Sequence, residues 1–302
     1  MSIELPIKIK LPSNFLDEET RCGYFISSDM KAVWAVELDL LSELDKVCKR
    51  LSIKYFLDAG NLLGAVRDGK FIPWDDDIDL VMLRNDYDKL MKDGSCLFQY
   101  PYFLQCPYSD KEYARPHAQL RNSNTCAAMK NEGKSVIFNQ GIFIDIFPLD
   151  GILENDLNCQ IKMVKKIKKP AKYISFHHSK KLHVELFRKI RANIYKAIYG
   201  DIPTIFERLD NYVRQSSEER YVDKVTFRDD VSKICYLKKS WFEQSVVLEF
   251  EEFKCAVPSA YDEILKAYYG TDYMTPKQQS TVHGGNGGMI FDAYKPYKDV
   301  LF

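Results

Sequence analysis

The sequence of 302 residues has no long apolar run. Its longest uncharged stretch, residues 94–109, has 16 residues and contains Pro101 and Pro107, so it is too short and too polar for a membrane-spanning helix. The first 21 residues lack the apolar centre and the small-residue cleavage site of a secretory signal. We therefore expect a cytoplasmic protein without a spanning helix.

Patterned cysteines are also missing. The eight cysteines are scattered and none forms a CxxC pair, which predicts reduced thiols rather than a zinc site or a disulfide framework. The sequence shows no internal repeat and no low-complexity linker. With 46% hydrophobic and 13% aromatic residues, the composition excludes a disordered or collagen-like chain and suits one large or two ordinary globular domains.

The net charge is zero, with 43 basic and 43 acidic residues, but the charges are segregated. Residues 161–200 hold twelve Lys or Arg and one acid, Glu185. Apolar residues recur among these lysines at helical intervals, so the alternatives are a solvated helix face and a surface for an anionic acceptor or an anionic membrane. Nucleic acid ranks lower as a partner because no recognition motif accompanies the charge.

Helix and strand patterns alternate through the first 150 residues, which is typical of an α/β or α+β catalytic core. Apolar residues at spacings of three and four predict a helix that ends near Leu51, with Ser28 or Asp29 as its N-cap. The other predicted helices cover residues 61–67 and 85–91, and the predicted strands cover 54–59, 78–83, 102–105, 118–121 and 142–147.

The middle third has helical periodicity and little strand signal. We therefore divide the chain into a lead-in, a catalytic core, a basic helical subdomain, and a C-terminal part that completes the core. This last part has a hairpin near residues 246–256, a helix and a glycine-rich tail. The boundaries are 1–29, 30–153, 154–236 and 237–302.

An aspartate cluster precedes the second predicted strand in the segment IPWDDDIDLVM, which contains Asp75, Asp76, Asp77 and Asp79. Side chains alternate along a strand, so Asp77 and Asp79 point the same way, about 7 Å apart. Two such carboxylates repel each other unless a cation lies between them, and carboxylate oxygens suit Mg²⁺ or Mn²⁺. A solvated acidic loop is the alternative.

The surrounding sequence favours the metal site. Gly60 and Asn61 open a helix whose free N–H groups can face phosphate oxygens. Asp145 lies in the centre of an apolar strand, where an unpaired carboxylate would be costly to bury. A metal shared with the first two aspartates would remove that cost; an ion pair with Arg67 or Arg121 is the alternative.

Three motifs resemble the LicD family, which includes the fukutin-related proteins, within the polymerase-β-like nucleotidyltransferase superfamily. They are GNLLGAVRDGKFIPWDDDIDLVM, GIFIDIFPLD and YDEILKAYYGTDYMTP. The resemblance implies an α/β (α+β) fold with a nucleotidyltransferase-like mixed sheet and a helical subdomain. The superfamily pattern falls on Gly60, Asn61, Asp77, Asp79 and Asp145, and Asn61 replaces the usual small hydroxyl residue.

The resemblance further implies a metal-dependent phosphotransferase. Its donor would be CDP-linked, such as CDP-choline or a CDP-polyol, and its acceptor a hydroxyl of a cell-surface glycan or teichoic-acid-like polymer. Asp77 and Asp79 would hold the metal on the diphosphate, while Asp145 would complete the metal site or take the hydroxyl proton. Arg67 is the expected diphosphate clamp and Arg121 a weaker candidate for the same role.

Several questions stay open at this level. His283 precedes flexible glycines and is kept as a candidate ligand residue. Tyr268, Tyr269 and Tyr273 are either core residues or an aromatic wall, so the sequence does not choose choline over a polyol. A glycosyltransferase using a nucleotide-sugar is disfavoured because it leaves Gly60 and Asp145 unexplained. A non-catalytic protein that binds anionic polymers is the third possibility.

Overall fold

The computed structural model describes residues 4–130, 132, 136–175, 182–278 and 288–302. The α-helices are α1 (Ser28–Leu51), α2 (Ala59–Arg67), α3 (Arg84–Lys89), α4 (Leu157–Ile174), α5 (Leu182–Tyr199), α6 (Ile202–Arg214), α7 (Tyr261–Tyr269) and α8 (Tyr297–Leu301). The strands are β1 (Glu19–Arg21), β2 (Tyr24–Ile26), β3 (Phe56–Leu57), β4 (Asp79–Leu83), β5 (Tyr102–Gln105), β6 (Ala118–Asn122), β7 (Cys126–Met129), β8 (Ile142–Gly151), β9 (Tyr221–Asp223), β10 (Leu237–Lys238), β11 (Ser245–Phe250), β12 (Phe253–Pro258) and β13 (Met289–Asp292).

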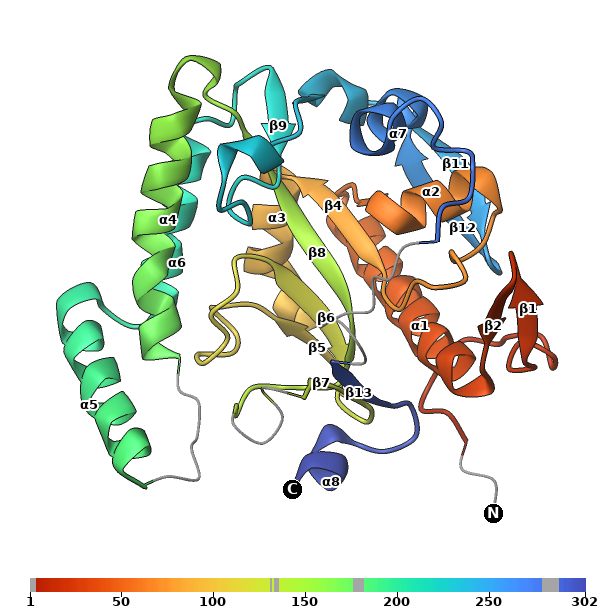
Figure 1. Cartoon of the computed structure of the whole chain (residues 1–302), viewed down its shortest axis with the longest axis horizontal. Helices are drawn as coiled ribbons and strands as arrows, with labels where there is room; N and C mark the ends of the chain where they lie inside the picture. Colours follow the sequence, from red (N-terminus) through yellow and green to blue (C-terminus); the bar gives the residue numbers. More distant parts are fainter. Residues whose placement is uncertain (1–3, 131, 133–135, 176–181, 279–287) are drawn as a thin grey trace.

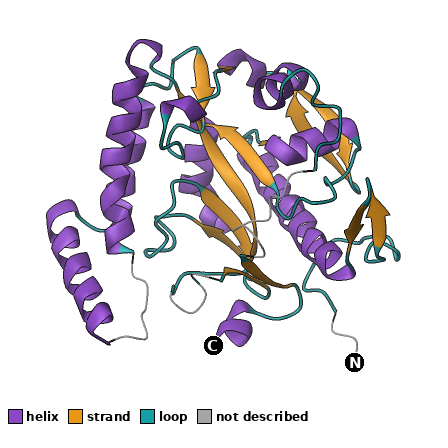
Figure 2. Ribbon diagram, in the orientation of Figure 1, coloured by secondary structure: helices purple, strands orange, loops and turns teal. Residues whose placement is uncertain are grey.

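A mixed sheet built around β8 forms the centre of the molecule (Figures 1 and 2). Strand β8 is the longest strand, and all ten of its residues are buried. It pairs in parallel with β4 on one side and antiparallel with β6 on the other. Strands β3 and β5 extend these two sides, and β9 joins the far end of β8. The predicted mixed α/β architecture is thereby confirmed.

Helix α1 packs its long apolar face into the main core. Its end at Leu51 matches the prediction, but the N-cap is Ser27 rather than Ser28 or Asp29. The Ser27 hydroxyl accepts a hydrogen bond from the amide of Met30 at 3.2 Å. Burial of Trp34, Leu38 and Leu41 on this helix ties it to the sheet. The apolar residues of β4 add to the same core.

Helices α4 and α6 enclose a second apolar core at the side of the molecule away from α2 and α7 (Figure 1). Ile161, Val164, Ile205 and Leu209 are among its buried residues, so the predicted helical region packs around a core of its own. An ionic cluster joins it to the sheet. Arg84 contacts Asp150 of β8 at 2.6 Å and Asp210 of α6 at 3.2 Å.

Three strands differ from the sequence interpretation. Strand β9 lies within the stretch assigned to the helical subdomain but pairs with β8 in the central sheet. Strands β7 and β13 had no clear pattern, and they pair with each other across more than 150 residues of sequence.

Within the described residues, no helix has the length and apolarity needed to cross a membrane. All eight cysteines are free thiols, as predicted.

Candidate active site

The parallel pairing of β4 with β8 brings the three predicted carboxylates together. Asp79 is the register partner of Asp145, and adjacent residues of a parallel pair present their side chains on the same face. Asp77 lies just before β4, and one oxygen from each of Asp77, Asp79 and Asp145 lies within 4.8 Å of the others. Ile78 and Leu80 are fully buried in the core, as the alternation predicts.

This cluster brings several carboxylates close together and is largely shielded from water. Burial, together with the neighbouring carboxylates, raises the pKa of Asp77 well above its usual range. Burial also raises the pKa of Asp79 to about 7, although Lys224 opposes the shift. Glu37 of α1 is buried beside these aspartates, and its pKa is raised by burial and then by Asp76 and Asp75. Buried carboxylates that repel one another are a fitting donor set for a divalent cation.

The start of α2 holds the aspartate segment in place. The Asn61 side chain is buried; its Nδ2 donates to the carbonyl of Asp77 at 2.9 Å, and its Oδ1 accepts from the amide of Asp79 at 2.6 Å. Gly60 packs closely on Asp75, because a Cβ at Gly60 would lie 2.3 Å from a carboxylate oxygen of Asp75 and would displace that side chain. Asn61 thus positions the aspartate segment, and contact of Gly60 and Asn61 with donor phosphate stays a prediction.

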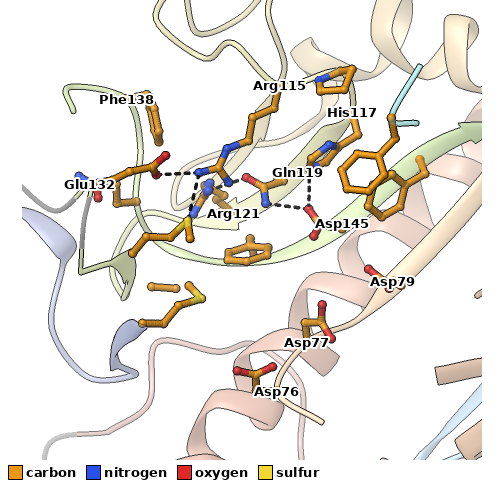
Figure 3. A pocket seen from close by; sticks show the side chains of 18 of the residues that line it. Asp76, Asp77, Asp79, Arg115, His117, Gln119, Arg121, Glu132, Phe138 and Asp145 are labelled. Atoms are coloured by element: carbon orange, nitrogen blue, oxygen red, sulfur yellow. Dashed lines mark hydrogen bonds and ion pairs between the residues drawn. The ribbon is translucent and has the colours of Figure 1, made fainter. Parts of the chain in front are cut away.

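Strand β6 supplies a row of polar side chains opposite the carboxylates (Figure 3). The Nε2 atom of His117 lies 3.1 Å from Oδ1 of Asp145, and Gln119 donates to the same oxygen at 2.7 Å. Arg121, predicted as a possible diphosphate clamp, is buried and donates to Gln105, Gln119 and the carbonyl of Gly141. Arg121 therefore orients Gln119, which in turn orients Asp145.

A lysine from the segment after β9 faces the cluster from the other side. The Nζ atom of Lys224 lies 2.6 Å from Oδ2 of Asp58, which links β3 to α2. Burial disfavours the lysine's charge, but Asp58 and Asp79 outweigh this effect, so the pKa of Lys224 is raised. Lys224 is thus a cation beside Asp79 that the sequence analysis did not identify.

These groups line one cavity of about 720 Å³. Asp77, Asp79 and Asp145 lie along it with the aromatic rings of Phe138, Phe147 and others. Arg115 contributes from the far wall, where it contacts Glu132 at 2.7 Å (Figure 3). The cavity therefore combines a carboxylate cluster, cationic side chains and apolar walls, which is the composition expected of a site for a charged organic substrate.

Arg67 lines a second cavity of about 340 Å³, which also contains Gly60 and Asp75. Its Nε atom contacts Asp68 at 2.9 Å, while its Nη2 atom is buried without a hydrogen-bond partner among the described residues. Aromatic rings form much of the wall, from Trp74, Tyr268, Tyr269 and Tyr273. Asp75 lines both cavities, so the aspartate segment borders each of them.

The basic region also differs in detail from the sequence interpretation. Lys168 was expected on a charged surface, but it is buried. Its Nζ donates to the carbonyls of Thr226 and Arg228 at 2.9 and 3.1 Å. It therefore braces the segment that carries Phe227 and Arg228 into the main cavity. The candidate His283 lies outside the described residues.

Residues 52–260 match the sequence model of the "LicD/FKTN/FKRP, nucleotidyltransferase domain" family. The chain belongs to the LicD family. A curated relative, the "Lipopolysaccharide cholinephosphotransferase LicD" of Haemophilus influenzae, is 26% identical over 256 residues, which cover 82% of this chain and 92% of the relative. The resemblance inferred from the three motifs is thereby confirmed.

Membership of the LicD family also confirms the expected enzyme class, a LicD-like phosphotransferase. The matched region contains the cluster of Asp77, Asp79 and Asp145 as well as the helical segment. Of the residues found only in the structure, His117, Gln119 and Lys224 also lie inside it.

Proposed function

We propose that this LicD-family chain transfers a substituted phosphate, such as phosphocholine or a polyol phosphate, from a CDP-linked donor to a glycan hydroxyl. The observation that carries the proposal is the cluster of Asp77, Asp79 and Asp145 along the main cavity. The name of the Haemophilus influenzae relative supports phosphocholine as a group to test first.

The residues suit Mg²⁺ or Mn²⁺, because the oxygens of two buried carboxylates, Asp77 and Asp145, and of the partly buried Asp79 lie within 4.8 Å of one another. Burial raises the pKa of both Asp77 and Asp79. A bound divalent ion would neutralise charge on the phosphates as the reaction proceeds. Lys224 and Arg228 also line the cavity, and both offer positive charge to an anionic donor.

The transfer requires one bond to form and one to break. The acceptor oxygen attacks the phosphorus that carries the head group, the bond from that phosphorus to the bridging oxygen breaks, and CMP departs. The hydroxyl proton needs an acceptor in the cavity. We assign it to the pair of Asp145 and His117, since they contact each other at 3.1 Å and both line the cavity.

The two cavities can bind different parts of the substrates. The smaller cavity, with Arg67 and several aromatic rings, suits the flat base of a nucleotide, because a ring stacks on aromatic faces and a guanidinium donates to carbonyl oxygens. The larger cavity then takes the head group and the acceptor. A third cavity of about 290 Å³ continues from it past Phe227 and Arg228 to Lys172 of α4, offering positive charge to an anionic acceptor.

The proposal includes the cytoplasm as the location and a lipid-linked glycan as one form of the acceptor. It is tested by incubating the purified protein with CDP-choline, CDP-glycerol or CDP-ribitol and a glycan acceptor. Release of CMP with transfer of the head group supports it. Release of UDP or GDP from a sugar nucleotide would instead support a glycosyltransferase, and anionic-polymer binding without turnover would support a binding protein.

His117 provides a narrower test of the proton assignment. His117→Asn removes the Asp145 contact while leaving Asp77 and Asp79 unchanged, so we expect a lower kcat with a preserved response of thermal stability to Mg²⁺. The matched variant His117→Gln keeps a donor of similar reach and should retain more activity. A wild-type kcat in both variants would remove His117 from the reaction.

A further inference from the structure

Helix α5 carries an apolar stripe that faces solvent. Five of its large apolar residues are between 51% and 65% exposed. They follow helical spacings of three, four, seven and eight residues, which places them along one face. The stripe consists of Leu186, Phe187, Ile190, Ile194 and Ile198. Sequence periodicity predicted a helix here with an apolar face, and the structure shows that this face is exposed.

The opposite face of α5 packs against α4 and the second core. Tyr195 packs against the second core, and its ring lies 4.8 Å from that of Tyr173 on α4. Arg191 lies over the same Tyr173 ring at 5.0 Å. Helix α5 is therefore fixed on α4 by its inner face, at the edge of the molecule (Figure 1), and its apolar stripe has no described segment packed on it. A contiguous exposed stripe of this kind marks an interaction surface.

The charges beside the stripe indicate the chemistry of the partner. By helical geometry, the exposed Lys189 and Lys196 border the stripe on one side, and Lys189 contacts Glu185 at 3.1 Å. Exposed lysines of α4 add to the positive field, at positions 162, 165, 166, 169 and 172. Residues 161–200 hold only one acidic residue, Glu185. An apolar stripe with basic borders fits a membrane rich in anionic lipids, where apolar side chains enter and cations stay at the headgroups.

A second copy of the chain fits this surface less well. A two-fold contact would place the same helix against itself. The basic borders of both copies would then face one another and repel, whereas anionic headgroups would neutralise them.

We propose that α5 docks the enzyme on anionic membranes as an in-plane amphipathic helix, with its apolar stripe in the lipid and the basic side chains of α4 and α5 at the headgroups. This proposal extends the proposed function by giving the enzyme a route to lipid-linked acceptors. It does not depend on the identity of the donor, because docking is measured without substrate.

The test is flotation of the full chain with vesicles of phosphatidylcholine alone or mixed with phosphatidylglycerol. The stripe variant is Phe187→Ser with Ile194→Ser. The matched control is Phe25→Ser with Val247→Ser, which changes two apolar residues that are 58% and 62% exposed and lie outside α5. Because all four side chains are exposed, the variants should fold normally, which circular dichroism and thermal melting verify.

We expect the wild-type chain and the control to float with anionic vesicles, and at least tenfold weaker partitioning for the stripe variant. Added salt should weaken the wild-type interaction, and neutral vesicles should bind far less protein. Head-group transfer to a soluble acceptor should be unchanged in the stripe variant, which separates loss of docking from loss of catalysis.

Three results would overturn the proposal. The first is wild-type protein that stays unbound at every lipid composition. The second is equal flotation of the stripe variant and wild type. The third is a wild-type dimer in solution that the stripe substitutions convert to a monomer without altering vesicle binding, which would assign the stripe to a second copy.

Discussion

Replacing Asp77 by Asn should make the metal-free protein more stable while strongly reducing its stabilisation by Mg²⁺. The Asp77 carboxylate lies within 4.8 Å of Asp79 and Asp145, and burial with these neighbours raises its pKa. One pair of charges at that distance costs about 3 kcal/mol at an effective dielectric constant of about 20. The asparagine has a similar shape and no charge, so it relieves this repulsion.

The substitution should raise the free energy of unfolding by at most about 3 kcal/mol, because partial protonation of the carboxylates already lowers their repulsion in the wild-type protein. For a chain of this size it corresponds to a rise in Tm of up to about 6 °C. Mg²⁺ in excess should stabilise the wild-type protein by about 2 to 3 kcal/mol when its concentration is about 100 times the Kd. The variant lacks one ligand and should gain much less.

The assay is thermal unfolding at pH 8, with EDTA or with Mg²⁺, on wild type, Asp77→Asn and the control Asp17→Asn. Asp17 is an exposed aspartate in the lead-in, away from the cluster. The control should match wild type in both buffers. The reasoning fails if Asp77→Asn is less stable than wild type in EDTA, or if Mg²⁺ stabilises both proteins equally.

Four further predictions concern neighbouring groups. The pKa of about 7 at Asp79 means that protons compete with Mg²⁺ below that pH, so the Kd for Mg²⁺ measured by calorimetry should rise up to about tenfold per pH unit; a flat profile would contradict this. The same raised pKa implies that the metal-free protein loses stability as the pH rises from about 4 to about 7, because in this range the folded state still holds a proton that the unfolded state has lost. Lys224→Met leaves Asp58 buried without its 2.6 Å partner and should cost about 3 to 5 kcal/mol in chemical unfolding, with Lys224→Arg recovering part of it. An unchanged stability would show that this ion pair does not stabilise the fold. Arg84→Met strips Asp150 and Asp210 of a buried cation and should destabilise the fold by a similar amount without changing the Mg²⁺ response; a selective loss of that response would contradict the assigned structural role.

Local patterns predicted the parts of the site that lie on single segments. The alternation of Asp77 with Ile78 and of Asp79 with Leu80 placed two carboxylates on one face, and the structure has both apolar residues fully buried. Asp145 was singled out because a carboxylate in the centre of an apolar strand needs a partner. The parallel pairing of β4 and β8 brings these predictions together.

Other residues depend on contacts between distant segments. Lys224 contacts Asp58, which lies 166 residues away in the sequence, and no local sequence pattern predicts such a contact. His117 and Gln119 had a usable signal, because they alternate with Arg121 along one strand and alternate residues share a face. Of these three residues, only Arg121 was predicted to belong to the site, because His117 has no metal-ligand spacing with any cysteine.

Helix α5 illustrates a different limit. The spacing of Phe187, Ile190, Ile194 and Ile198 correctly predicted a helix. Periodicity identifies an apolar face but not what covers it. Only the packing of Tyr195 on α4 shows that this face points to solvent. Similarly, the charge of Lys168 suggested a surface residue, whereas its aliphatic stem and three nearby carbonyls hold it inside the fold.

The most direct test of the central claim is the nucleotide released by purified protein given CDP-choline, CDP-glycerol or CDP-ribitol with a glycan acceptor and Mg²⁺. The account predicts CMP in amounts equal to the head group transferred, with loss of both products in EDTA and in Asp79→Asn. Transfer that persists unchanged in EDTA and in Asp79→Asn would contradict it, as would release of UDP or GDP from a sugar nucleotide in place of CMP.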